Sequence, residues 1–357
     1  MRRWMLLRQA LLDPACLPAL SMAEWDVVLR LGRASLLTAS LENRARAAGV
    51  LELLPEPVQA QLAAARVLTE ANRRGVTWEV NRLVKALEPQ GIPVILLKGA
   101  AYAMTRLPAG EGRLFNDVDI LVPRERLADV EQALYWHGWI GGHHDAYDQR
   151  YYREWMHELP PLIHQKRQSV LDVHHTILPP TARYHPDPAK LRADAIAVPG
   201  MPGVQVLAST DMVIHSACHL FHEGEWDHGL RDLLDLDALL RHFGRDQAFW
   251  PSLAARAVEM ELSRPLYYAL RYCTHVWATP VPPDIVAPLR HQGPNSLTAR
   301  VMDALILRAL APVHSLTRTP VEKLVRFGLY VRGHWLRMPA HQLIPHLLRK
   351  AVKPKDV

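Results

Sequence analysis

Apolar residues recur at spacings of three and four through the first part of the chain, from Trp4 to about Lys85. The clearest set comprises Trp25, Val28, Leu29, Leu36, Leu37 and Leu41, and a second comprises Val67, Val76, Val80 and Val84. This spacing places the apolar side chains on one face of a helix. We therefore expect a helical N-terminal region over residues 1–88.

The pattern then changes to one typical of a small sheet. Residues 91–97 form a continuous apolar run of strand length, and the alanine-rich residues 100–106 suit a short helix. Residues 117–122 alternate as a strand, and Pro123 opens a helix that runs to about His137. The sequence thus predicts the order strand, helix, strand, helix.

Two further apolar runs, residues 159–165 and 169–175, read as a hairpin. The Pro- and Gly-rich residues 179–203 are expected to be a linker. Helical spacing then returns in five stretches, at residues 209–222, 227–243, 251–277, 297–311 and 319–351. We therefore expect an α+β protein in three parts: a helical region (1–88), a core with a small mixed sheet (89–180), and a helical domain with a basic tail (181–357).

The composition is that of an ordinary globular protein, with 49% hydrophobic and 22% charged residues. No apolar run reaches the roughly 18 residues of a membrane-spanning helix, and the N-terminal apolar run is broken by Arg8 and Asp13, so we expect no signal peptide. Cys16, Cys218 and Cys273 are far apart and form no CxxC pair. Neither a disulfide framework nor a cysteine zinc site is indicated, and we expect a cytoplasmic protein.

The net charge of +6 lies in the last part of the chain. Residues 321–357 hold eight lysines and arginines against two acidic residues, so the rest of the chain is neutral. A neutral body argues against binding to long nucleic acid. The basic stretch is either a solvated helix face or a contact surface for an acidic partner or a membrane.

The residues with the clearest chemistry lie between Leu96 and Val122. Asp117 and Asp119 stand two apart on an apolar strand, so their carboxylates leave the same face side by side. Two such charges indicate divalent cations, Mg²⁺ or Mn²⁺. Upstream, a strand ends at Lys98 and Gly99, where the amides of Ala100 and Ala101 are available to a phosphate.

These motifs resemble a known family. A glycine turn after a strand, an Asp-x-Asp strand and a third carboxylate on a later strand are the layout of the polymerase β-like nucleotidyltransferase superfamily. Within it, LLKG, Arg113, DVDILV, LDVHH and HLFHEGEWDHGLRDLLDLDALL resemble the uncharacterised bacterial nucleotidyltransferase family proteins. The resemblance covers roughly residues 20–250, and implies a polymerase β-like core.

The resemblance assigns roles to individual residues. Asp117, Asp119 and Asp172 would be the catalytic carboxylates and metal ligands. The residues that would contact the nucleotide or its phosphates are Lys98, Gly99, Ala100, Arg113 and His174. The superfamily's usual Gly-Ser is Gly99-Ala100 here, which removes a hydroxyl that often touches the terminal phosphates. Lys98 replaces that contact, or the phosphate site is altered.

Other roles stay open for several of these residues. Asp172 could pair with a neighbouring histidine, and Arg113 could brace its loop. His215, Cys218, His219 and His222 share a helix face, and core or pocket-lining histidines are a simpler interpretation of that face than a zinc site. His219, His222, Trp226 and Asp232 are candidates for contacting base or acceptor.

The resemblance implies metal-dependent transfer of a nucleotidyl group from an NTP to a hydroxyl or phosphate of an acceptor, with release of pyrophosphate. The acceptor could be a small molecule, a sugar, a protein or a peptide of a tailoring pathway. Two alternatives remain: a catalytically weak nucleotide-binding or interaction protein, and transfer of a phosphoryl or glycosyl group from an activated nucleotide.

Overall fold

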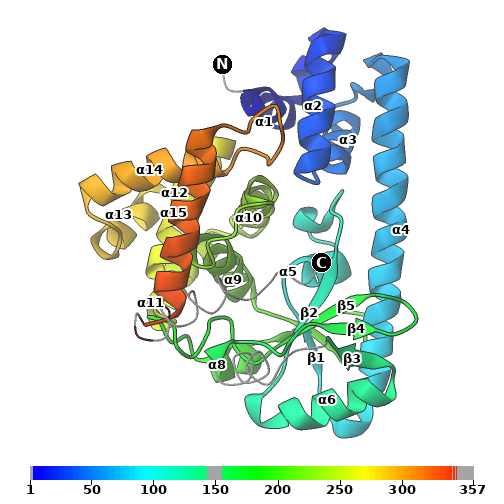
Figure 1. The fold of residues 1–357 in the computed structure, drawn as a ribbon, viewed down its shortest axis with the longest axis vertical. Coiled ribbons are helices and arrows are strands. Elements are labelled where there is room, and N and C mark those ends of the chain that lie inside the picture. Colours follow the sequence, from blue (N-terminus) through cyan, green and yellow to red (C-terminus); the bar gives the residue numbers. More distant parts are fainter. Residues whose placement is uncertain (1–2, 143–154, 340, 342, 344–357) are drawn as a thin grey trace.

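The computed structural model describes residues 3–142, 155–339, 341 and 343 (Figure 1). Its N-terminal part is helical, as predicted. The helices are α1 (Trp4–Leu12), α2 (Met22–Ala34), α3 (Thr38–Ala47) and α4 (Glu56–Leu87). At about 1.5 Å per residue, the 32 residues of α4 span about 48 Å. In Figure 1, α4 runs along one edge of the molecule from the N-terminal helices to the sheet.

One mixed sheet forms the centre of the fold, with strand order β3-β4-β5-β2-β1-β7-β6. Its strands are β1 (Val94–Leu96), β2 (Asp117–Leu121), β3 (Trp139–Gly141), β4 (Leu162–His164), β5 (Val170–His174), β6 (Ile196–Ala197) and β7 (Val204–Val206). Strand pairs β1/β7 and β2/β5 are parallel, and the other neighbours are antiparallel. Helices α5 (Lys98–Met104) and α6 (Leu127–Trp136) follow β1 and β2. The fold is therefore α+β, and the predicted β4/β5 hairpin is confirmed.

The prediction of a linker over residues 179–203 is wrong. This segment contains α8 (Pro188–Ala193) and β6, and β7 follows it and pairs with β1. Gly200 and Gly203 have positive φ angles of 76° and 80°, so the glycines form the turn that leads from β6 into β7. The sheet thus continues beyond residue 180, where the core was expected to end.

Helices that follow the sheet pack around α9. They are α9 (Ser209–His222), α10 (Gly229–Phe243), α11 (Phe249–Glu259), α12 (Ser263–Trp277), α13 (Pro283–Gln292), α14 (Ser296–Ala309) and α15 (Pro320–Arg337). Helix α9 contacts α5 of the core as well as α10, α11, α12 and α15, and it lies between the sheet and the outer helices in Figure 1. This contact brings α9 and α10 to the face where the aspartates lie.

The single helix predicted over residues 251–277 is two helices. The chain turns at Glu261, which has a left-handed φ of 60°. Pro265 lies in the first turn of α12, where its ring would clash with the carbonyl of Glu261 if the helix continued. The break follows from this proline.

The basic C-terminal stretch begins with α15, capped by Thr319 and Glu322. Its solvent face exposes the large apolar side chains of Leu324, Phe327 and Trp335. The end of the predicted helix over 319–351, with the last four basic residues, lies outside the described residues. Among the helices of the described ranges, none is both long and apolar enough to cross a membrane.

Candidate functional site

Strands β2 and β5 bring the three predicted aspartates to one face of the sheet. The two strands are parallel, and Asp119 lies directly opposite Asp172 in their register. Asp117 is two residues before Asp119 and therefore points to the same side. Val118, which lies between these two aspartates, and Ile120, which follows Asp119, are buried in the core.

Asp119 is the most enclosed of the three, with 3% of its surface exposed. Its Oδ1 lies 3.0 Å from Lys98 Nζ and 3.0 Å from His174 Nε2. Burial alone would raise the pKa of Asp119, but Lys98 and His174 outweigh it and hold that pKa well below its usual range. Asp119 is thus a fixed negative charge.

Lys98 reaches Asp119 because of the turn between β1 and α5. Its backbone adopts a left-handed φ of 45°, which is uncommon for a residue with a side chain. The amide of Leu97 donates to the carbonyl of Asp119 at 3.0 Å and ties the end of β1 to β2. The amide of Ala101, expected to be available to a phosphate, instead donates to the carbonyl of Leu97 at 3.4 Å. The expectation for this amide is wrong because the α5 turn already uses it.

Asp172 has an incomplete set of partners. Its Oδ1 is buried and has no hydrogen-bond partner in the described structure. Burial and the negative charges of Asp119 and Glu158 raise the pKa of Asp172 to about 7. A buried, unpartnered carboxylate oxygen beside two further carboxylates is a donor set that suits Mg²⁺ or Mn²⁺, so the residues fit the metal that the resemblance implies.

A second set of donors adjoins the aspartates. His157, Glu158 and His174 offer ligand atoms that lie within 4.8 Å of one another, the one such group found among the described residues. His174 Nδ1 is 3.3 Å from Glu158 Oε2, while Glu223 Oε1 is 3.9 Å from His157 Nε2. Among the described residues, the ligand atoms of the three aspartates do not come together in such a group.

Gly99 makes room for Arg113. A Cβ at Gly99 would lie 1.8 Å from Arg113 Nη1 and 2.7 Å from the Phe115 ring. Arg113 Nε donates to Asp235 Oδ2 of α10 at 2.7 Å, and its guanidinium lies 5.2 Å from the centre of the Phe115 ring. The guanidinium expected at the triphosphate thus already has a carboxylate partner.

Replacing Gly99 by Ala is expected to destabilise the fold by about 1–3 kcal/mol, since Arg113 is held too firmly to move aside. Gly75 is the matched control. A Cβ there meets nothing within 4 Å, so Gly75→Ala in the middle of α4 should stabilise the fold by up to about 1 kcal/mol. Urea unfolding of both variants measures the difference, and equal effects would contradict the packing at Gly99.

A cleft of about 230 Å³ opens between the aspartate face and helices α9 and α10. Its lining includes Lys98, Gly99, Arg113, Asp117 and Asp119 from the core and Ser216, His219 and Asp232 from the helices. Of the predicted helix residues, His219 and Asp232 therefore line the cleft. His222 and Trp226 do not line it: His222 packs near Tyr184, and Trp226 packs against Phe221.

Cys218 and His215 are also buried, and within the described ranges the four residues of that helix face form no group of metal donors. The burial of His215 and Cys218 and the position of His219 in the cleft agree with the interpretation of the face as core and pocket lining. Burial lowers the pKa of His215 well below its usual value, with the charges of Lys98 and His174 adding to the effect, so its ring is neutral.

Comparison with known proteins identifies the family of this chain. The sequence profile of an uncharacterised nucleotidyltransferase family matches residues 21–278. The chain belongs to this nucleotidyltransferase family. The match includes the sheet, the aspartates and helices α9 to α12, and it supports nucleotidyl transfer as the general reaction class. Searches of curated proteins and of solved structures gave no significant match.

Sequence reasoning missed three residues that lie beside the predicted ones. His157 and Glu158 precede β4, and Glu158 forms a bridge with His174. Glu223 caps the end of α9 and lies 3.3 Å from His219. The sequence signal for Glu223 was its place four residues after His219. Nothing local marks His157 or Glu158.

Asp172 is expected to make the stability of the metal-free protein depend on pH. Its folded pKa of about 7 lies above the unfolded value of about 3.9, so the folded state holds the proton more tightly. The contribution of this group to the free energy of unfolding is fully present below about pH 4. It decreases as the pH rises and is lost once the pH passes about 7. Asp172→Asn should therefore stabilise the protein by about 3 kcal/mol more at pH 8.5 than at pH 5, measured by urea unfolding in EDTA. An equal effect at both pH values would contradict the buried, uncompensated charge.

Proposed function

We propose that this chain transfers a nucleoside monophosphate group from an NTP to a hydroxyl or phosphate of an acceptor and releases pyrophosphate. The observation that carries the proposal is the convergence of Asp117, Asp119 and Asp172 on one face of β2 and β5, with Lys98 at 3.0 Å from Asp119. Family membership supports the reaction class. The acceptor is proposed to be a small molecule, a sugar, a peptide or a protein.

Asp117, Asp119 and Asp172 would hold Mg²⁺ or Mn²⁺. When bound, the metal would supply positive charge for the phosphates and acidify the acceptor hydroxyl. Lys98 would neutralise charge at the same face, since its ammonium already lies against Asp119. The buried side chain of Ala100 offers no hydroxyl, so Lys98 is the group proposed for the terminal phosphates.

Asp172 is proposed to accept the proton of the acceptor. The acceptor oxygen forms a bond to the α-phosphorus, the bond from that phosphorus to the bridging oxygen of the β-phosphate breaks, and pyrophosphate leaves. Asp172 lies opposite Asp119 in the strand register, so the face proposed to hold the metal also offers a carboxylate to take this proton. His174, between Asp119 and Glu158, would fix the orientation of Asp119.

Pyrophosphate release with each of the four NTPs, together with a mass search for adducts, tests the proposal. We expect metal-dependent release and an adduct whose mass equals one nucleoside monophosphate. A phosphoryl or hexosyl mass would establish the alternative transfer. Metal-dependent NTP binding without any turnover, across the acceptor classes named above, would favour the nucleotide-binding protein that does not catalyse transfer.

Two proposals of less consequence concern the surroundings of the chain. We propose a cytoplasmic location, in keeping with three cysteines that are all free.

We also propose that the basic C-terminal stretch contacts an acidic partner or a membrane surface, supported by the exposed apolar face of α15. Sedimentation with anionic and with neutral vesicles tests the membrane arm: no enrichment on anionic vesicles would remove it.

A further inference from the structure

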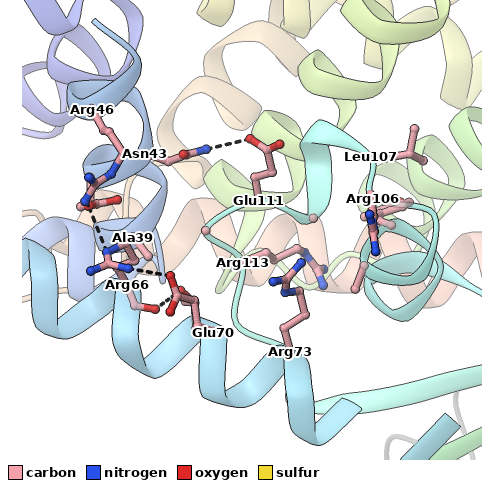
Figure 2. A pocket seen from close by; sticks show the side chains of 16 residues that line it. Ala39, Asn43, Arg46, Arg66, Glu70, Arg73, Arg106, Leu107, Glu111 and Arg113 are labelled. Atoms are coloured by element: carbon pink, nitrogen blue, oxygen red, sulfur yellow. Dashed lines mark hydrogen bonds and ion pairs between the residues drawn. The ribbon is translucent and has the colours of Figure 1, made fainter. Parts of the chain in front are cut away.

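A second and larger cavity, of about 550 Å³, lies beside the aspartate cleft. Helices α3 and α4 form one wall of it, and the segment from Tyr102 to Arg113 forms the other (Figure 2). Its charged lining is mostly basic: Arg46, Arg66, Arg73, Arg106 and Arg113 against Glu42, Glu70 and Glu111. A volume of this size accommodates a small molecule or a peptide side chain.

The glutamates of this cavity are all engaged. Glu42 pairs with Arg46, and Glu70 Oε1 lies 2.7 Å from Arg66 Nη1. Glu111 accepts a hydrogen bond from Asn43 Nδ2 at 2.9 Å. Glu42 and Glu70 are thus neutralised by arginines, whereas Glu111 has a neutral amide as its partner and keeps its negative charge.

Arg73 and Arg106 are in the opposite situation. Within the described part of the chain, neither guanidinium has an ion pair or a hydrogen bond. In Figure 2 the side chain of Arg73 projects from α4 toward Arg113, and Arg106 also lines this cavity. The cavity thus presents two uncompensated guanidinium groups and a third that is already paired with Asp235.

The cavity and the aspartate cleft are adjacent, and their linings differ in charge: the cavity lining is mostly basic and the cleft lining mostly acidic. Tyr102 and Arg113 line both. In the cleft, six carboxylates face three cationic side chains, and each of those cations is ion-paired: Lys98 with Asp119, Arg113 with Asp235 and Arg231 with Asp232. Of the lysines and arginines that line the cleft and the cavity, those without an ion pair in the described structure therefore lie in the cavity.

The arginine cavity is held in shape without a ligand. Gly112 has a φ of 65° and lies so close to α3 that a Cβ there would be 2.7 Å from the backbone of Ala39. The hydroxyl of Ser40 donates to the carbonyl of Gly112 at 3.3 Å. Arg106 itself has a left-handed φ of 54° at the end of α5. Because the cavity is preformed, a ligand that binds there does not have to pay the entropic cost of ordering its walls.

We propose that this cavity binds a phosphate group of a substrate, with Arg73 and Arg106 as its main contacts. The fork of the guanidinium matches two phosphate oxygens and makes charge-assisted hydrogen bonds. The proposal rests on the proposed function for the identity of the reaction, but the binding itself requires no catalysis. The phosphate belongs either to the acceptor or to the terminal part of the NTP.

Calorimetric titration of inorganic pyrophosphate in EDTA tests the site. Wild type should bind, and Arg73→Gln/Arg106→Gln should bind at least about 30-fold more weakly. Arg74→Gln/Arg318→Gln, which removes two exposed guanidinium groups outside the cavity, should bind like wild type. Circular dichroism of all proteins establishes that they are folded. Absence of binding to wild type, or equal losses in both double variants, would overturn the proposal.

Two further arms separate the cavity from the aspartate site and identify the source of the phosphate. Asp119→Asn should still bind pyrophosphate in EDTA, because the cavity does not depend on that carboxylate, and loss of binding there would overturn the assignment to the cavity. A non-hydrolysable NTP with Mg²⁺ is then titrated into the arginine double variant. Weaker NTP binding assigns the site to the terminal phosphates of the NTP, and unchanged NTP binding with lost pyrophosphate binding assigns it to the acceptor.

Discussion

Asp119→Asn is expected to lower metal-dependent pyrophosphate release by at least about 10³-fold. The substitution keeps the size of the side chain but removes the negative charge that holds Lys98 Nζ and His174 Nε2 at 3.0 Å. It also removes one of the three carboxylates proposed to hold the metal. Initial rates with the NTP and acceptor that support wild-type turnover provide the measurement.

Asp129→Asn is the matched control for this experiment. Asp129 is ion-paired with Arg126 at the start of α6, 2.6 Å apart, and lies outside the cleft. Its rate should equal that of wild type. A rate for Asp119→Asn within about tenfold of wild type would remove Asp119 from the proposed metal site.

Asp235→Ala is expected to destabilise the fold by about 3–5 kcal/mol. Arg113 and Asp235 have only 12% and 11% of their side chains exposed, so removing the carboxylate leaves a buried guanidinium without its partner. The double variant Arg113→Ala/Asp235→Ala should recover part of the loss, because no uncompensated charge remains. Urea unfolding of Asp235→Ala, Arg113→Ala and the double variant gives the coupling free energy between the two side chains.

The pair of Arg30 and Asp26 is the control for burial. Its atoms are 2.8 Å apart, against 2.7 Å for the buried pair, but its side chains are 52% and 54% exposed. Asp26→Ala should therefore change stability by less than about 1 kcal/mol. Equal losses in Asp26→Ala and Asp235→Ala would contradict the account of Arg113 as a buried charge held by α10.

The features that could be predicted from the sequence are those fixed by near neighbours in the chain. Alternation in residues 117–121 determines that Asp117 and Asp119 share a face, and the hairpin of β4 and β5 is set by a short turn. Strands β6 and β7 were missed because they are two and three residues long in a segment rich in proline and glycine. Strand β7 pairs with β1, which lies more than 100 residues earlier, and β6 pairs with β7.

The same reason explains which parts of the site were predicted. The aspartates, Lys98 and His174 lie in motifs, whereas the contact of His157 with Glu223 joins two segments that have no common pattern. Arg113 was expected at a phosphate, but its nearest partner is Asp235, which is 122 residues away along the chain. The arginine cavity was not predicted at all, since α3, α4 and the segment before β2 each contribute only part of it.

The central claim is that the aspartates hold a metal-bound nucleotide, and it can be tested without knowing the acceptor. Binding of a non-hydrolysable NTP is measured by calorimetry with Mg²⁺ and with EDTA, for wild type and for Asp119→Asn. We predict that wild type binds the NTP much more tightly with Mg²⁺ than with EDTA, and that Asp119→Asn loses this metal-dependent gain while its fold is retained. Equal binding with and without metal, or equal metal-dependent binding by Asp119→Asn, would contradict the claim.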